Sequence, residues 1–161
     1  MFHVYLLLGA NLGKRFDQIQ SAFDKVEKQV GKVIQHSSIY ETAAWGVEDE
    51  PSYLNQVLHV ETRLKPLEVL EKINLIESQL GRTRNLKWES RLIDIDILFY
   101  EDLCIESPKL TVPHPYLHLR KFTLIPLTEI APKLIHPVLK KSSMELLHEL
   151  KDDLEVMKLD L

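Results

Sequence analysis

The sequence has few of the residues that define specialised classes of protein. Among its 161 residues there are one cysteine, five glycines and eight prolines. A single cysteine, Cys104, excludes an internal disulfide and a cysteine-based zinc site, which fits a reducing compartment. We expect its thiol to be buried as a small hydrophobic group. The low glycine and proline content excludes a collagen-like or disordered chain.

Excess positive charge and long apolar runs are also missing. Twenty Lys and Arg stand against 24 Asp and Glu, which gives a net charge of −4. No global positive field then favours nucleic acid or an anionic membrane as a partner. The longest stretch without a charged side chain, residues 1–13, is too short to span a bilayer and lacks the features of a signal peptide. We therefore expect a cytoplasmic protein.

The hydrophobic content, 45 %, is enough for the core of one domain of this length, so we expect a single domain over 1–161. Apolar spacing and turn residues then divide the chain into strands and helices. Strands are predicted at 2–8, 33–40, 53–62 and 92–100, and long helices at 16–30 and 66–80.

The order strand, helix, strand, strand, helix, strand is the split βαβ pattern of a ferredoxin-like α+β core. Additional C-terminal helices are predicted at 118–128 and 144–151, where Ser142 and Glu145 form a candidate capping box. Residues 154–159 are predicted to form a short edge strand.

A run of cationic side chains is followed directly by two aspartates. Asp94 and Asp96 are two residues apart on the predicted strand 92–100, so both carboxylates face one side while the neighbouring isoleucines face the core. Two carboxylates on a rigid strand suit Mg²⁺, which takes further ligands from water and substrate phosphates. The preceding side chains that can bind phosphate oxygens are Arg82, Arg84, Lys87 and Arg91.

Taken alone, an Asp-x-Asp pair is most often a solvent-exposed strand face. The adjacent cationic segment favours a site for nucleotide phosphates and a divalent metal. Because no covalent nucleophile is evident, we expect chemistry by positioning and charge stabilisation.

A second group of residues suggests a pocket for a flat heterocycle. Tyr53 and Asn55 share a strand face, and an aromatic ring beside a carboxamide can stack a heterocycle and bind its polar edge. Ordinary packing is the alternative for each of these residues. Further candidates for the same pocket are Thr42, Trp45, Trp88 and Phe122.

The local sequence pattern assigns no role to three polar residues, which are Glu77, His114 and His118. Glu77, on the predicted helix 66–80, faces solvent when it is considered alone. His114 and His118 are four residues apart, but Pro115 argues against a zinc-binding pair on a helix. A surface position or a phosphate contact is the better interpretation of His114.

Together these features resemble the hydroxymethyl-dihydropterin pyrophosphokinase family of folate biosynthesis. The residues that match the family occur in the same order along nearly the whole chain. It rests most specifically on the ordered Arg/Asp-x-Asp pattern and on a Thr-Val-Pro-His segment. The matching segments are 8–13, 40–42, 53–55, 81–84, 93–98, 110–114 and 129–132.

The resemblance implies that pyrophosphate is transferred from ATP to the hydroxymethyl group of 6-hydroxymethyl-7,8-dihydropterin, with release of AMP, by a monomer. It implies that Asp94 and Asp96 hold two Mg²⁺ ions and that Arg82 and Arg91 join them as catalytic residues. The implied nucleotide-binding residues are Glu77, Arg84, Trp88, His114 and Arg120. The implied pterin-binding residues are Thr42, Trp45, Tyr53, Asn55 and Phe122.

Two other functions stay open at this point. Another Mg²⁺-dependent transferase that uses nucleotides would keep the aspartates and arginines but would not need the heterocycle pocket. A ferredoxin-like ligand-binding module without enzymatic activity would leave the cationic segment as a solvated surface. The nucleotide product formed from ATP would separate these alternatives.

Overall fold

The structure, a computed structural model, describes residues 1–42, 52–81 and 92–160. These residues form a six-stranded sheet, a two-stranded ribbon and four α-helices. The strands are β1 (Phe2–Ala10), β2 (Lys32–His36), β3 (Tyr40–Thr42), β4 (Tyr53–Thr62), β5 (Asp94–Tyr100), β6 (Ile105–Glu106), β7 (Thr111–Val112) and β8 (Val156–Lys158). The helices are α1 (Arg15–Gln29), α2 (Pro66–Gln79), α3 (Lys121–Ile130) and α4 (Ser143–Glu149), with a 3₁₀ turn, η1 (Leu117–Leu119).

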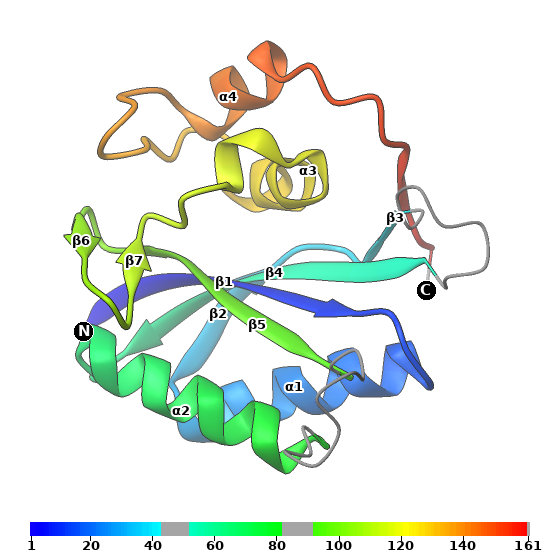
Figure 1. The fold of residues 1–161 in the computed structure, drawn as a ribbon, viewed down its shortest axis with the longest axis vertical. Helices are drawn as coiled ribbons and strands as arrows, with labels where there is room; N and C mark the ends of the chain where they lie inside the picture. Colours follow the sequence, from blue (N-terminus) through cyan, green and yellow to red (C-terminus); the bar gives the residue numbers. More distant parts are fainter. Residues whose placement is uncertain (43–51, 82–91, 161) are drawn as a thin grey trace.

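The main sheet is antiparallel and has the strand order of a ferredoxin-like fold (Figure 1). Neighbouring strands follow the order β5-β1-β4-β3-β8, and β2 also pairs with β4. The predicted split βαβ core is therefore confirmed, with β2 and β3 together taking the place of its second strand. The additional helices α3 and α4 and the edge strand β8 follow this core in the chain.

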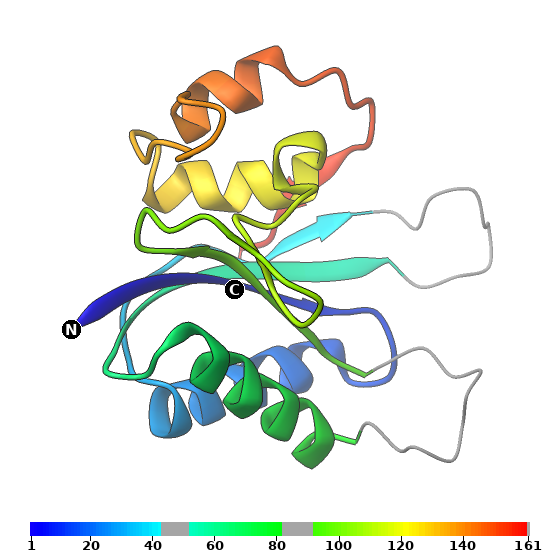
Figure 2. The ribbon, with the colours of Figure 1, turned by 60° about the vertical axis from the view of Figure 1, so that its left-hand side comes forward.

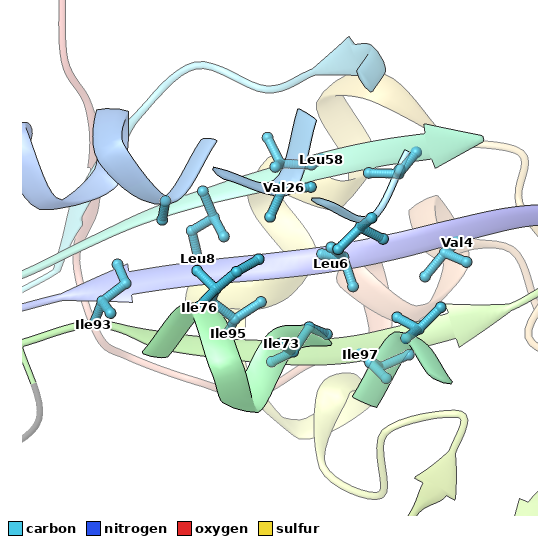
Figure 3. Packing of buried hydrophobic residues seen from close by; sticks show 14 of the residues in the cluster. Val4, Leu6, Leu8, Val26, Leu58, Ile73, Ile76, Ile93, Ile95 and Ile97 are labelled. Atoms are coloured by element: carbon cyan, nitrogen blue, oxygen red, sulfur yellow. The ribbon is translucent and has the colours of Figure 1, made fainter. Parts of the chain in front are cut away.

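Helices cover both faces of the sheet (Figures 1 and 2). On one face, alternate β1 residues Val4, Leu6 and Leu8 pack with Ile73 and Ile76 of α2 (Figure 3). Each such side chain contributes about 1.5–3 kcal/mol of hydrophobic free energy when it is fully buried. Among the described helices, none has the length and apolar character needed to cross a membrane.

The opposite face of the sheet carries a second apolar cluster. Leu7 of β1 and Val57 of β4 pack there with Leu124 and Leu127 of α3. Since β1 places successive side chains in two different clusters, its nearly continuous apolar sequence is explained by burial on both faces.

Strand β5 contains a bulge that the sequence pattern did not reveal. Ile95 and Ile97 pack in the same cluster as Leu6, as predicted, but the pairing with β1 shifts by one residue after Ile97. Phe99 consequently lies in the α3-side cluster, whereas Tyr100 lies on the α1 and α2 side. Strict alternation along the whole predicted strand 92–100 places Phe99 with the isoleucines and Tyr100 with the aspartates. This prediction was wrong because an extra residue reverses the faces of a strand.

Two other local predictions were wrong. The segment 33–40 is not one strand, because β2 ends at His36 and β3 begins at Tyr40. Between them, the Ser37 hydroxyl accepts a hydrogen bond from the Val57 amide. Cys104 is exposed instead of buried, since the chain has already turned away from the sheet after β5.

Three side chains near the start of β1 form a contact cluster on the α3 side of the sheet. His3 Nδ1 lies 2.8 Å from His59 Nε2, and the His59 ring stacks on Tyr5 with 4.4 Å between centroids. Burial lowers the pKa of His59 below 6.5, and the neighbouring His3 lowers it further against the opposite effects of Glu61 and Glu101. Burial first, and then the neighbouring His3, therefore favour the neutral form of His59.

We expect the free energy of unfolding to fall as the pH decreases below about 6.5. His59 has a lower pKa when folded, so the unfolded state binds more protons in this range and is stabilised by acid. Burial lowers the pKa of His136 too, and this adds to the effect. Urea unfolding at pH 7.5, 6.5 and 5.5 measures it, and His59→Asn should reduce the slope. The exposed-site variant His148→Asn serves as control, and a slope equal in the two variants would contradict the assignment.

Candidate active site

A cavity of about 340 Å³ opens where β1, β4, β5 and β3 meet the start of α3. One part of its wall is charged and another is aromatic or amide-bearing. The charged side chains are Asp94, Asp96 and Arg120. The other lining residues are Leu7, Gly9, Thr42, Tyr53, Asn55, Phe122 and Leu154.

The first residues of β5 bring two carboxylates to the cavity. Asp94 pairs with Gly9 and Asp96 with Leu7, while Ile95 between them is buried in the core. Asp96 keeps 42 % of its side chain exposed to solvent. The predicted common orientation of Asp94 and Asp96 is confirmed by their shared place in the cavity wall.

The two strand carboxylates are hard oxygen donors of the kind that Mg²⁺ takes in proteins. Among the described residues, no group of three or more His, Cys, Asp or Glu side chains is arranged to hold a metal ion. Two strand carboxylates beside open space fit a hard cation that keeps water and substrate oxygens as its remaining ligands.

Glu77 is buried beneath the aspartates, so the interpretation of a solvent-facing helical Glu was wrong. Its side chain is 4 % exposed, and its Oε2 accepts a hydrogen bond of 3.1 Å from the amide of Ile95. Ile95 is the residue between Asp94 and Asp96. Glu77 therefore fixes the backbone that carries both carboxylates, from the opposite face of the sheet.

His114 lies beside Asp96 and is held by the backbone around it. Its amide donates to Leu98 O, and its Nδ1 accepts from the Tyr116 amide. The neutral ring then carries its proton on Nε2, which lies 4.0 Å from Asp96 Oδ2. Burial lowers the pKa of His114, Asp96 opposes this effect and Arg120 adds to it. At neutral pH the ring is a neutral hydrogen-bond donor beside the carboxylate.

The start of α3 contributes a cation and a ring to the same wall. The guanidinium of Arg120 lies 5.3 Å from the Tyr116 ring centroid and 5.6 Å from that of Phe122. Such cation–π contacts restrict a long side chain without neutralising its charge. Arg120 thus remains available for an anionic ligand.

The amide-bearing wall is formed by β4 and its neighbours on both sides. Asn55 pairs with Gly9 of β1, and Thr42 of β3 pairs with Tyr53. Asn55 Nδ2 donates to Leu8 O, but Asn55 Oδ1 and Thr42 Oγ1 are buried without a hydrogen-bond partner among the described residues. Buried polar atoms of this kind are costly unless a ligand or water satisfies them.

The lack of a side chain at Gly9 leaves room for the Asn55 carboxamide. A Cβ atom at Gly9 would lie 2.9 Å from Asn55 Nδ2, closer than such contacts normally are. The absence of a side chain at this point of β1 therefore determines where the carboxamide stands in the cavity.

Several predicted site residues lie outside the described part of the chain. They are Trp45, Arg82, Arg84, Trp88 and Arg91. Of the described candidates, six line the cavity together with Arg120, whereas His114 lies beside Asp96 and Glu77 lies beneath β5. The six are Thr42, Tyr53, Asn55, Asp94, Asp96 and Phe122.

Sequence reasoning missed Leu154 as a cavity residue. It reaches the cavity because β8 pairs with β3, so that Val156 lies opposite Thr42. No local pattern around Leu154 signals this contact, which depends on a pairing between distant parts of the chain.

The fold and cavity define a ferredoxin-like α+β protein with a small-molecule site built on paired carboxylates. A sequence profile of the 7,8-dihydro-6-hydroxymethylpterin-pyrophosphokinase (HPPK) family matches residues 5–132. The chain belongs to this family.

Individual relatives agree with this membership. The chain is 44 % identical over 145 residues to the 2-amino-4-hydroxy-6-hydroxymethyldihydropteridine pyrophosphokinase of Aquifex aeolicus, covering 90 % of each chain. It is 36 % identical to the Haemophilus influenzae enzyme of the same name, covering 85 % of this chain and 86 % of that one.

Solved structures share the fold. A Plasmodium falciparum HPPK-DHPS structure superposes with a TM-score of 0.75 at 19 % identity over 92 % of this chain. The chain spans less than half of that longer protein, 44 % of its length. It also spans 20 % of the Schizosaccharomyces pombe folic acid synthesis protein fol1, to which it is 40 % identical.

We expect Glu77→Ala to lower the free energy of unfolding by about 1–3 kcal/mol, because the buried Ile95 amide loses its acceptor. Urea unfolding measures the change. Glu71→Ala removes an exposed carboxylate from the same helix and is the matched control. Equal stabilities of the two variants would contradict a structural role for Glu77.

Proposed function

We propose that this chain transfers the pyrophosphoryl group of ATP to the hydroxyl of 6-hydroxymethyl-7,8-dihydropterin, releasing AMP, in folate biosynthesis. Membership of the HPPK family supports the reaction. The observation that links the reaction to particular residues is the cavity, whose wall combines two carboxylates with aromatic and amide-bearing side chains. One part suits metal and phosphates, and the other suits a flat heterocycle.

The pterin is proposed to lie between the rings of Tyr53 and Phe122. Asn55 Oδ1 and Thr42 Oγ1 are buried acceptors without a described partner, and the amino and ring N–H groups of a pterin are donors of matching type. Satisfying these atoms removes a desolvation cost that the ligand-free site bears. This gives selectivity for a heterocycle with donors on one edge.

Asp94 and Asp96 are proposed to hold two Mg²⁺ ions. Bound there, Mg²⁺ would neutralise phosphate charge and align the attacking and leaving oxygens. Arg120 is proposed to bind the triphosphate through its guanidinium, and His114 through Nε2–H. Glu77 is proposed to act on the nucleotide side by keeping the aspartate backbone in place.

The remaining proposed roles follow from resemblance to the family. Catalytic phosphate contacts are assigned to Arg82 and Arg91, a further nucleotide contact to Arg84, and closure over the ligands to Trp45 and Trp88. We also propose a monomer whose partners are its two small-molecule substrates.

The proposed reaction is a displacement at the β-phosphorus of ATP. The pterin hydroxyl oxygen forms the new bond to the β-phosphorus and releases its proton to solvent. The bond between the β-phosphorus and the α,β-bridging oxygen breaks, and AMP leaves with that oxygen. Tyr53, Phe122 and Asn55 fix the acceptor, and Arg120 and His114 offer donors to the phosphates. Positioning and charge stabilisation of this kind suffice for phosphoryl-type transfer without a covalent intermediate.

Turnover with ATP, Mg²⁺ and 6-hydroxymethyl-7,8-dihydropterin tests the proposal. We expect AMP as the nucleotide product, formed only when the pterin is present. In Asp94→Asn and Asp96→Asn, kcat should fall roughly 100-fold or more, because preorganised charge is lost at the phosphates. Excess EDTA should abolish turnover.

Each other outcome of this assay would indicate a different function. Formation of ADP would indicate a simple kinase, and nucleotide turnover independent of pterin would indicate another transferase. Folded protein without any product would indicate a ligand-binding module. Near-normal turnover of either aspartate variant at saturating Mg²⁺ would contradict the proposed metal site.

We expect Gly9→Ala to raise the KM for the pterin roughly 10-fold, because the added methyl group displaces the Asn55 carboxamide. The KM for ATP should change by less than about twofold, since the phosphate side is untouched. Steady-state kinetics with each substrate varied in turn measures both constants. An equal rise in the two constants would mean that the substitution disturbs the whole site.

A further inference from the structure

Leu154 lines the cavity although it lies outside the part of the chain that matches the family profile. The profile ends at residue 132, and Leu154 belongs to the later segment 151–160. Its side chain is half-buried, so a ligand in the cavity could cover more of its surface. The cavity therefore has one apolar wall that the matched region does not supply.

The segment 151–160 is attached to α3 just before Leu154. Asp152 Oδ2 accepts a hydrogen bond of 3.1 Å from the Lys121 amide in the first turn of α3. Its other oxygen, Oδ1, accepts one of 2.9 Å from the amide of Leu154 itself. One carboxylate thus joins the backbone of Leu154 to the helix start that carries Phe122.

The same segment is attached to β3 just after Leu154. β8 pairs with β3 so that Val156 lies opposite Thr42, and the Leu159 amide donates to Ile39 O at 2.9 Å. Figures 1 and 2 show this segment descending from α4 to the edge of the sheet beside β3. Leu154 is consequently held between the two elements that carry Thr42 and Phe122.

We propose that Leu154 contacts the pterin and determines which ring substituents the site accepts. The inference rests on the proposed function, because Thr42 and Phe122 are assigned to the pterin there. The apolar side chain between them covers ring surface that offers no hydrogen bonds. The two attachments fix the backbone of Leu154. A larger side chain at this position, or a larger substituent on the pterin ring, would therefore overlap with packed atoms of the cavity wall.

Leu154→Ala tests the contact because it should change the KM for the pterin but not the KM for ATP. The KM for 6-hydroxymethyl-7,8-dihydropterin should rise roughly 10-fold, since an apolar contact of a few carbon atoms is lost. The KM for ATP and the melting temperature should stay at the wild-type values. Leu154→Met, which keeps the volume and apolar character, should restore the pterin KM to within about twofold.

A matched control lies three residues away. Met157 is on β8, but its side chain is 52 % exposed and does not line the cavity. Met157→Ala should leave both KM values unchanged. Leu154→Ala should also accept pterins with an added methyl or ethyl group better, relative to the parent pterin, than the wild type does.

The outcomes separate this inference from the proposed function. If the wild type forms AMP and Leu154→Ala keeps the wild-type pterin KM, the contact is wrong and the function stands. A parallel rise in the KM for ATP would indicate a merely structural role and would overturn the contact too. If the wild type forms no AMP, pterin binding measured by calorimetry decides. Equal affinity in wild type and Leu154→Ala, or no binding in either, rejects the contact.

Discussion

The alternation of side chains along β5 is the constraint on which the candidate site depends. Ile93, Ile95 and Ile97 are buried against α1 and α2, so Asp94 and Asp96 must face the other way. A slip of one residue would bury two carboxylates against α1 and α2 and would move the three isoleucines out of that core, and both changes are costly. The hydrophobic core thus sets the direction of the charged groups, and Glu77 adds a hydrogen bond at Ile95 that opposes the slip.

Strand pairing across the centre of the sheet places the amide-bearing wall of the cavity next to these carboxylates. Gly9 lies between its two partners, Asp94 on β5 and Asn55 on β4. The distance between the charged and the amide-bearing parts of the cavity is therefore set by the spacing of three adjacent strands. Strand pairing fixes the separation of the backbone positions that carry these side chains, which suits a site that has to hold two substrates in line.

Much of this arrangement could be predicted from the sequence because it depends on local periodicity. The strands, the two long helices and the shared face of Asp94 and Asp96 follow from spacings of two and of three or four residues. The bulge in β5 could not be predicted, because it exists only in relation to β1. Glu77 looked solvent-exposed because helical spacing does not reveal that the Ile95 amide lies within reach of a carboxylate. The place of Leu154 depends on the pairing of β8 with β3, and no local sequence pattern around Leu154 indicates this pairing.

Segment 151–160 makes the cavity depend on contacts between distant parts of the chain. The cavity draws on residues from Leu7 to Leu154, so its first and last wall residues are separated by most of the chain. The wall of the cavity is therefore complete only when β8 is paired with β3 and Asp152 is bonded to the Lys121 amide at the start of α3. A substitution that weakens either attachment would change the shape of the cavity without altering any residue of its charged wall.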